Sequence, residues 1–387
     1  MRNLLKDIVS ESALVGWAQD FVRCPSPQTE RFEAEPAVLS FIEKVVGRRL
    51  DDLGLPYRRD EMGNLIVEIG PPSDHGVMLM AYAMTHPAAN MTTPYAGELI
   101  EVNGADAIRG RGISEQKGSL AAALAATYAM YRRGNLTGRL ALTVSTAGET
   151  GRHDAARAIL KAVETRPSAA VVVIGTTGRV SVGNKGRLDV LITVRGRAAH
   201  SSTPWKAVDA VAGARKVMDR LDTLDLRSRP HQGLGKATLA ITSIRSFPDA
   251  THTIQSEVRL IYDRRLLPGD SPDEAVAQIT TALENMDPWR VDVRPGPLMY
   301  PCEINMNGPM ISSITNGLCD AGLEAPGFFH SHGSLDAGLF AKDGIEATMW
   351  GPGDMDQWHS DNEYIFISDL CRGADAYYAF LCDYIGR

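Results

Sequence analysis

Apolar segments that alternate with helices through the first half of the chain limit the fold more than any other feature of the sequence. Residues 77–82 form a continuous apolar run, and residues 139–145 and 169–175 are mainly apolar. Such runs predict strands that are buried on both faces of a sheet. Helices are predicted between them, at 119–132 and 154–164. This alternation indicates an α/β fold with a mixed, mostly parallel sheet between helices.

The same pattern continues on both sides of these segments. Helical spacing is found at 10–22 and 36–53, and short strands are predicted at 57–60 and 65–70. Near the C-terminus we expect a helix at 307–321, a strand that ends at 347–350 and a helix from residue 368. These segments therefore belong to one α/β domain whose sequence is interrupted in the middle.

The pattern changes between residues 186 and 294. It predicts a strand at 186–196, a helix at 205–224, strands at 236–246 and 253–263, a helix at 272–286 and a strand at 290–294. This β-α-β-β-α-β order is the ferredoxin-like split motif. We therefore predict an inserted second domain at 187–297, with the α/β domain formed by 1–186 and 298–387.

Length and composition are those of a two-domain globular protein. A chain of 387 residues is long for a single core. The net charge of −7 argues against nucleic acid or an anionic membrane as the main partner. No apolar run approaches the roughly 20 residues of a membrane helix, and residues 1–7 are unlike a signal peptide. The five cysteines are scattered, which favours reduced thiols and a cytoplasmic location.

A loop near the C-terminus carries a single imidazole among acids. Gly351 and Pro352 end the strand before it, and His359 follows among several Asp residues. Carboxylates around a His orient its ring and favour metal binding or protonation. A surface His beside acids is also often only solvated. This loop alone does not decide between a ligand and a solvated side chain.

Five segments together are typical of one protein family. They are Gly110-Arg111-Gly112 with Lys117-Gly118, Glu149-Thr150-Gly151, residues 196–202, Asp263-Arg264-Arg265 with Pro268-Gly269, and the loop 351–364 with Asn362-Glu363-Tyr364. In this order the chain resembles the M20 family of metallopeptidases and amidohydrolases over nearly its whole length. The resemblance implies a zinc-peptidase type catalytic domain, with the insert as its lid and dimerisation domain, and metal-dependent hydrolysis of a C–N bond.

The resemblance implies a metal site at three positions. The family binds two metal ions that share one bridging carboxylate, and one of the ions is also held by a Glu and a late His. The matching residues are Glu115, Glu149 and His359, which are all competent ligands. Glu115 is one methylene longer than the usual bridging Asp. The alternative is a dead fold that binds a molecule without metal.

The second metal site of the family is not retained. Its ligand positions hold Tyr82 and Thr176, which are poor ligands for a divalent ion at neutral pH. The carboxylate that orients the early His is replaced by Met84, and the general-base Glu by Gly148. Because the losses fall on one site, we infer a mononuclear centre with one exchangeable divalent ion per subunit, Mn²⁺, Zn²⁺, Fe²⁺ or Co²⁺.

Two further matches fall in the insert. His200 matches the lid His that reaches the active site of the partner subunit and polarises the substrate, which implies at least a homodimer; the alternative is a surface His. Arg265 falls near the lid arginines of the family, and its alternative is a solvated side chain. The lid Asn that helps to bind substrate falls near His252, so the usual carboxylate contact is in doubt.

The residue that replaces the missing general base is not fixed by the sequence. His86 lies just past Tyr82, where it could replace the lost ligand, act as a base or contact the substrate; the alternative is a loop His. His153, His330 and His332 are further candidates, as is Glu115 acting as a loose ligand. General bases contribute about 10²–10⁴ in rate, so some group must take the proton in a working enzyme.

Three functions fit this reduced site, and the first of them is the function that we predict from the sequence. In the first, a metal-activated water deaminates an electron-poor aromatic amine carboxylate, as in the branch of the family that converts 5-nitroanthranilate to 5-nitrosalicylate and ammonia. A nitro group would store the charge of the addition intermediate, and Tyr82 and Met84 would suit an aromatic ring. In the second, the substrate is an N-acyl amino acid or a small peptide. The third is a binding protein without catalysis, which the retained ligand trio argues against.

Overall fold

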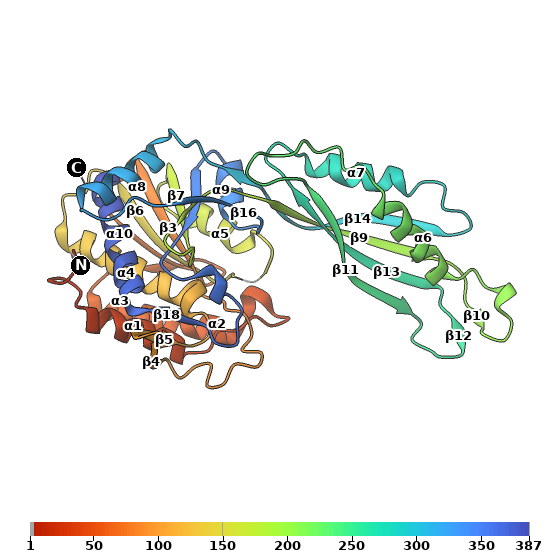
Figure 1. The fold of residues 1–387 in the computed structure, drawn as a ribbon, viewed down its shortest axis with the longest axis horizontal. Coiled ribbons are helices and arrows are strands. Elements are labelled where there is room, and N and C mark those ends of the chain that lie inside the picture. Colours follow the sequence, from red (N-terminus) through yellow and green to blue (C-terminus); the bar gives the residue numbers. More distant parts are fainter. Residues whose placement is uncertain (1–3, 149, 387) are drawn as a thin grey trace. The chain divides into compact units, whose positions relative to one another are not determined.

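The computed structural model describes residues 4–148 and 150–386, and the chain divides into two compact units. The first unit comprises Met1–Gly183, Cys302–His330 and Leu335–Arg387, and the second comprises Asn184–Pro301 with Ser331–Ser334. In Figure 1 most of the second unit is green and teal, and the first unit contains the red and blue ends of the chain. The insertion predicted at 187–297 lies inside the second unit, which extends a few residues further at both ends.

A six-stranded mixed sheet organises the first unit. In spatial order its strands are β1 (Arg58–Arg59), β2 (Leu65–Ile69), β6 (Arg139–Ser145), β3 (Gly76–Tyr82), β7 (Ala169–Val173) and β17 (Glu346–Trp350). The strands from β6 to β17 are parallel, and β1 and β2 are antiparallel to their neighbours. Every residue of β3 and β7 is buried, as their apolar sequences predict. The carboxyl ends of the parallel strands meet at one edge, where ligands bind in such sheets.

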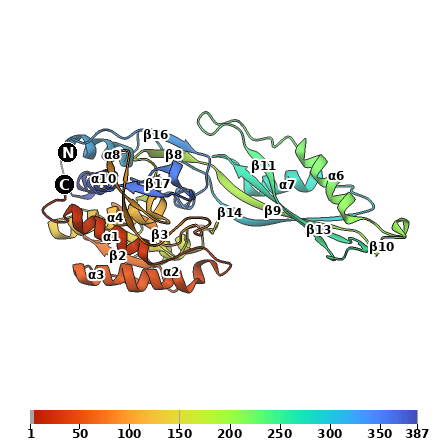
Figure 2. The ribbon, with the colours of Figure 1, turned by 60° about the horizontal axis from the view of Figure 1, so that its bottom comes forward.

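Helices surround this sheet. They are α1 (Glu11–Arg23), α2 (Pro36–Phe41), α3 (Arg48–Leu53), α4 (Gly118–Arg133), α5 (Asp154–Ala162), α8 (Pro309–Asp320), α9 (Ala337–Lys342) and α10 (Ile367–Ile385). The Ala-rich α4 packs against β3, β6 and β7, while α1 and α10 pack against α4 (Figure 2). Helix α5 contacts β6, and α9 contacts β7 and β17. The fold class predicted from the sequence is therefore confirmed.

Several short elements of the structure were not indicated by the sequence pattern. Strands β4 (Glu98–Val102), β5 (Ala105–Arg109) and β18 (Tyr364–Phe366) form one small sheet, and β8 (Val180–Asn184), β15 (Cys302–Glu303) and β16 (Phe328–Ser331) form another. Strand β16 contains His330, one of the candidate proton acceptors. The pairing of β18 with β5 brings the loop that follows β17 back beside the segment that follows β5.

The second unit has the predicted ferredoxin-like topology. Its elements are β9 (Gly186–Arg195), α6 (Ala210–Asp222), β11 (Thr238–Phe247), β13 (Glu257–Leu266), α7 (Pro272–Ala282) and β14 (Arg290–Met299). The sheet has the antiparallel order β11-β13-β9-β14, and α6 and α7 cover one of its faces (Figure 1). Strands β10 (Ala199–His200) and β12 (Thr253–Ile254) form a separate short pair. The apolar side chains between the sheet and its helices form a core of their own.

Several predicted elements of the second unit have different boundaries; the helix predicted at 272–286 ends at Ala282, and the strand predicted at 290–294 extends to Met299. The helix predicted at 205–224 begins only at Ala210, because the carboxylate of Asp209 caps it by accepting a hydrogen bond from the N–H of Val211 at 2.8 Å. The strand predicted at 253–263 is divided into β12 and β13. Among the helices of the described residues, none is both long and apolar enough to cross a membrane.

Candidate metal centre

The predicted ligands Glu115 and His359 lie together in the first unit. Glu115 is in a π-helical turn, Ile113–Lys117, between β5 and α4, and His359 is in the loop between β17 and β18. The Oε2 atom of Glu115 and the Nε2 atom of His359 are 3.3 Å apart. The Glu115 side chain is 6% exposed and the His359 side chain 43%, so solvent reaches the pair from the imidazole side. The third predicted ligand, Glu149, lies outside the described residues.

Backbone conformation brings these two segments into contact. A Cβ atom on Gly353 would lie 1.7 Å from the carbonyl oxygen of Ser114, an approach that only glycine allows. Gly112, just before the turn, has a left-handed φ of +78°. His359 also has a positive φ, +58°. For a residue with a side chain this conformation costs about 1 kcal/mol, so the imidazole occupies a strained position.

A buried carboxylate holds the turn that carries Glu115. The oxygens of Glu363 accept hydrogen bonds from the N–H groups of Gly112 at 2.7 Å, Ser114 at 2.9 Å and Glu115 at 3.1 Å. Arg111, which is completely buried, donates to the same carboxylate through Nη1 at 3.1 Å. Burial raises the pKa of Glu363, and these four donors oppose that rise.

The far end of the turn is held by a buried lysine. The Nζ atom of Lys117 donates to the carbonyl oxygens of Phe21 at 2.9 Å and Cys24 at 2.7 Å, at the C-terminal end of α1. It also lies 4.5 Å from the ring centroid of Phe41. Burial lowers the pKa of Lys117 to about 7. These contacts anchor the turn to α1.

His86 stacks on the candidate ligand His359. The ring centroids are 4.1 Å apart and the planes are inclined by 18°. The Nδ1 atom of His86 lies 2.9 Å from the carbonyl oxygen of Pro87. Because a carbonyl oxygen only accepts, we assign the proton of the neutral ring to Nδ1 and the lone pair to Nε2. His86 is thus able to accept a proton or to bind a metal beside the Glu115–His359 pair.

Tyr82, which stands at a position of the family's second metal site, is part of a buried hydrogen-bond network. Its hydroxyl donates to Oδ2 of Asp336 at 2.8 Å, and Nδ1 of His153 lies 2.6 Å from Oδ1 of the same carboxylate. None of these three residues is more than 2% exposed. Two donors thus compensate the buried carboxylate, as burial of such a group requires.

The other lost positions are closed by packing. A Cβ atom on Gly148 would lie 2.4 Å from the carbonyl oxygen of Met84, so this position has no room for a carboxylate side chain. The hydroxyl of Thr176 accepts a hydrogen bond from the N–H of Gly351 at 3.0 Å. Tyr82 is 2% exposed and Met84 is fully buried. The burial of both side chains therefore does not support the expectation that Tyr82 and Met84 suit an aromatic ring.

Three residues that shape this region carried no role in the sequence interpretation. Arg111 and Glu363 lie in matched segments, and the position of Arg111 between two glycines is a signal that could have indicated its role. Asp336 directly precedes the apolar helix α9, a pattern typical of a helix cap. Its side chain makes no cap hydrogen bond. It instead contacts Tyr82 and His153, both of which are far from Asp336 in the sequence. Only the folded structure shows that role.

The Glu115–His359 pair fits a divalent cation. Two ligands of a tetrahedral zinc ion, each about 2.1 Å from the metal, lie about 3.4 Å apart. The observed separation of Oε2 and Nε2 is 3.3 Å. One oxygen and one nitrogen donor suit Mn²⁺, Fe²⁺, Co²⁺ and Zn²⁺ without strong selection. These side chains are therefore able to hold the kind of ion that the sequence predicted.

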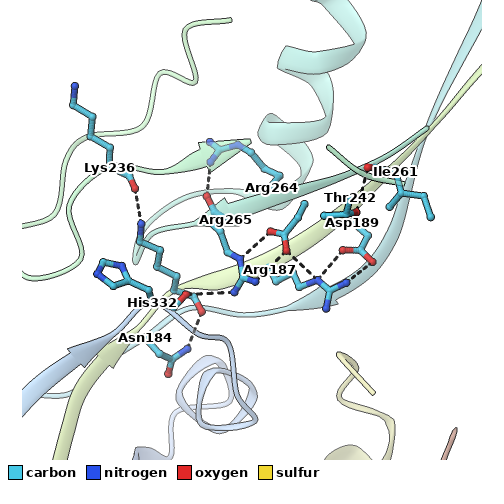
Figure 3. A network of polar contacts seen from close by, with 11 residues as sticks. Asn184, Arg187, Asp189, Lys236, Thr242, Ile261, Arg264, Arg265 and His332 are labelled. Atoms are coloured by element: carbon cyan, nitrogen blue, oxygen red, sulfur yellow. Dashed lines mark hydrogen bonds and ion pairs between the residues drawn. The ribbon is translucent and has the colours of Figure 1, made fainter. Parts of the chain in front are cut away.

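Arg265, which falls near the lid arginines of the family, is held within the sheet of the second unit. On β13, its Nε and Nη2 atoms contact the two oxygens of Asp263 at 2.8 and 3.0 Å, and Nη1 donates to the carbonyl oxygen of His332 at 3.3 Å (Figure 3). Arg187 on the neighbouring β9 makes the same paired contact with Asp189 at 2.8 and 2.9 Å. Two nitrogen atoms of each guanidinium thus already donate hydrogen bonds to a carboxylate of the same sheet. A catalytic role of Arg265 as a lid arginine remains a prediction.

His200 is an exposed residue of β10, also in the second unit. Its Nδ1 atom accepts a hydrogen bond from the N–H of Ser202 at 3.1 Å, which assigns the proton of the neutral ring to Nε2. The rings of His200 and His252 are stacked with centroids 6.5 Å apart. The predicted role of His200 at the site of a partner subunit stays a prediction.

Comparison with known proteins identifies the family. The model of Peptidase family M20/M25/M40 matches residues 85–383, and the chain belongs to this family. It is accordingly an enzyme of a divalent-metal-dependent hydrolase family, as the resemblance in its sequence predicted.

The curated relatives include two deacylating enzymes. The succinyl-diaminopimelate desuccinylase of Aliarcobacter butzleri is 24% identical over 285 residues, which cover 72% of this chain and 75% of the relative. The acetylornithine deacetylase of Aliivibrio fischeri is 25% identical over 332 residues, which cover 82% and 84%. The uncharacterised protein YgeY of Escherichia coli K12 is 23% identical and aligns with 95% of this chain and 94% of its own.

Solved structures share the fold over the whole chain. The M20 metallo-carboxypeptidase Sso-CP2 of Sulfolobus solfataricus has a TM-score of 0.79 at 16% identity and covers 96% of this chain and 99% of its own. The Bacillus subtilis protein YXEP, a dinuclear metal-binding peptidase of the M20 family, has a TM-score of 0.70 at 16% identity and covers 96% and 97%. At such identities these likenesses bear on the fold alone.

Proposed function

We propose that this M20 enzyme hydrolyses a C–N bond of a small substrate with a single divalent ion held by Glu115, Glu149 and His359. The observation that carries the proposal is the 3.3 Å separation of Glu115 Oε2 and His359 Nε2. When bound, such an ion acts as a Lewis acid and makes water a nucleophile near neutral pH. The cation would also compensate the charge of the nearly buried Glu115 carboxylate.

A count of one ion per subunit is supported by the region around the lost positions. The Tyr82 hydroxyl is bonded to Asp336, whose other oxygen is bonded to His153. Gly148 leaves no room for the carboxylate that serves as general base in the family. The Tyr82 hydroxyl is thus a hydrogen-bond donor at a position where the second ion of the family would need a ligand.

His86 is the proton acceptor that we propose. Its stacking on His359 places it beside the ligand pair, and the contact of Nδ1 with the carbonyl oxygen of Pro87 orients the ring. A neutral imidazole accepts a proton near pH 7. Replacement of His86 by Asn should then lower kcat by about 10²–10⁴, with little change in metal affinity.

The substrate class that we favour is an N-acyl amino acid or a small peptide. Relatives named as a desuccinylase and a deacetylase support it, because both remove an acyl group from nitrogen. Hydrolysis would release an amino acid and a carboxylic acid without ammonia.

Deamination of an electron-poor aromatic amine carboxylate, such as 5-nitroanthranilate, is the second candidate. The closed position at Gly148 favours it, because a ring with a nitro group stores the charge of the addition intermediate and needs less assistance than an amide. The products would be 5-nitrosalicylate and ammonia. Burial of Tyr82 and Met84 removes the support that these residues were expected to give.

A substrate panel with reloaded metal tests the proposal. Chelator-treated protein would receive Mn²⁺, Zn²⁺, Fe²⁺ or Co²⁺ and then N-acyl amino acids, dipeptides and nitroanthranilates, with products separated by chromatography and ammonia assayed. Acid without ammonia supports the amide substrate, and ammonia from the arene supports the second candidate. Activity that survives exhaustive chelation, or no turnover with any metal, would contradict the proposal.

We further propose a homodimer in a reducing compartment such as the cytoplasm. The five free cysteines are consistent with that location, and the match at His200 suggests a contribution to the site of a second subunit. Light scattering during size-exclusion chromatography tests the dimer. A monomer with full activity would contradict the role of His200.

A further inference from the structure

The candidate site is assembled from three irregular segments. Glu115 lies in the π-helical turn, His359 in the loop before β18, and His86 in the loop after β3. Side chains on loops hold a productive geometry only when neighbouring groups fix them to about 0.5 Å. The structure must therefore contain contacts that join these three segments to one another.

Glu363 joins the segment of His359 to the turn of Glu115. It follows His359 by four residues, and its carboxylate accepts the N–H groups of Gly112, Ser114 and Glu115. One of these donors is the N–H of the proposed ligand itself. A shift of the Glu363 carboxylate would thus move the turn relative to the loop.

Arg111 joins the third segment to the other two. Its Nη1 atom contacts Glu363 at 3.1 Å, and its Nη2 atom donates to the carbonyl oxygen of Ala88 at 3.1 Å, two residues after His86. Its backbone N–H donates to the carbonyl oxygen of Pro94 at 2.7 Å, in the same loop. The planar guanidinium therefore links the His86 loop with the carboxylate that holds the turn.

The cost of burying this ion pair argues for a role in geometry. The side chains of Arg111 and Glu363 are 0% and 1% exposed. Buried ion pairs are often no more stable than apolar residues of similar volume, whereas removal of one partner costs about 3–5 kcal/mol. The Arg111–Glu363 pair thus adds little net stability but contacts all three segments. It is therefore suited to hold the ligands in position.

We propose that Arg111 and Glu363 are positioning residues that set the affinity of the site for its metal ion by fixing Glu115 and His359 relative to each other, and that Arg111 also holds the His86 loop beside them. This inference rests on the proposed function and extends it to two side chains that do not touch the ion. Residues that orient metal ligands typically contribute 10–100-fold in affinity or activity.

The test uses conservative variants of the full chain. Glu363→Gln keeps one acceptor oxygen but loses the charge, and Arg111→Lys keeps the charge but loses the planar fork. Competition with a chromophoric chelator measures Zn²⁺ and Mn²⁺ affinity, and the absorption spectrum of bound Co²⁺ reports ligand geometry. We expect about 10–100-fold weaker binding and an altered Co²⁺ spectrum in both variants.

Glu68→Gln is the matched control. Glu68 is also a buried carboxylate of the first unit, 5% exposed and paired with Arg58 and Arg139 at 2.6 and 3.6 Å. It lies on β2 opposite Ala141, near the start of β6 and away from the carboxyl ends of the parallel strands. We expect this variant to lose stability and to keep its metal affinity and Co²⁺ spectrum.

A double variant separates folding from positioning. Arg111→Met leaves the Glu363 charge unpaired, and Glu363→Gln in the same chain removes that charge, so stability should partly recover while metal affinity stays low. Wild-type affinity in the folded single variants would overturn this inference alone. A wild-type chain that binds no divalent ion would overturn the proposed function together with it.

Discussion

His359 occupies a backbone conformation that its own side chain disfavours. Its φ of +58° is typical of glycine, and glycines stand nearby in the same loop at 351 and 353. An imidazole here lowers stability relative to glycine, and strained residues of this kind cluster at functional sites. In this conformation Nε2 of His359 lies 3.3 Å from Oε2 of Glu115, so the strained backbone places the imidazole beside the other candidate ligand.

Two substitutions at position 359 should separate the ligand from the strain. His359→Ala and His359→Gly both remove the imidazole, so both should abolish tight metal binding. Only Gly relieves the backbone, and the Gly variant should be more stable than the Ala variant by about 1 kcal/mol. Urea unfolding of the metal-free proteins measures the difference. An Ala variant that equals the Gly variant in stability would show that residue 359 is not strained.

Thiol chemistry provides a second test at this scale. Burial raises the pKa of Cys302 and Cys371 to about 12, and also raises the pKa of Cys24 and Cys382. A raised pKa leaves little thiolate at pH 8, and thiolate is the reactive form. Cys319 is exposed. An aromatic disulfide reagent at pH 8 should therefore modify one thiol rapidly, and Cys319→Ser should abolish this phase. Rapid modification of several thiols would contradict the described burial.

The sequence predicted the candidate ligands but not the residues that hold them. Glu115 and His359 were identified because ligand types occur at matched positions, and the structure brings these two together. Asp336 and Glu363 act through partners more than 180 residues away in the sequence. Such pairings depend on the tertiary fold, and no local periodicity or spacing encodes them.

At the scale of elements, residues 84 and 148, two positions where the resemblance implies carboxylates in the family, lie in close contact. Gly148 follows β6 by three residues and packs against the carbonyl oxygen of Met84, which follows β3 by two. The two strands are parallel neighbours, so their ends lie side by side. The residues that replace the two carboxylates therefore pack against each other at the ends of two adjacent strands.

A methyl group at position 148 should be costly. The Cβ of Gly148→Ala would lie 2.4 Å from Met84 O, so we expect a destabilisation of about 1–3 kcal/mol by overpacking. Gly16→Ala is the matched control, because a Cβ there meets nothing within 4 Å inside α1 and should stabilise the protein by about 0.5–1 kcal/mol. Urea unfolding compares the three proteins. A Gly148→Ala variant as stable as wild type would rule out the close contact.

Long elements were predictable and short ones were not. The buried strands β3, β6 and β7 and the helices α1 and α4 have strong apolar patterns and lie where the sequence placed them. Strands such as β5 and β18 are three to five residues long, and their pairing joins segments about 250 residues apart. Their stability comes from tertiary contacts, which leave little trace in local sequence.

At the scale of the whole molecule, each unit has its own hydrophobic core. Separate cores allow separate unfolding transitions. The proposed ligands all belong to the first unit, so metal should stabilise that unit alone, by about 2.7 kcal/mol at a hundredfold excess over Kd. Calorimetry with Mn²⁺ and with chelator should show one transition that shifts and one that does not. Equal shifts of both would contradict this expectation.

The number of ions bound per chain tests the single-metal centre most directly. Equilibrium dialysis against Zn²⁺ or Mn²⁺ at concentrations well above Kd, followed by elemental analysis, gives this number for the wild type and for a Glu115→Gln/His359→Ala variant. We predict one ion per wild-type chain and none in the variant. Two ions per wild-type chain, or an ion retained by the variant, would contradict a lone cation held by Glu115 and His359.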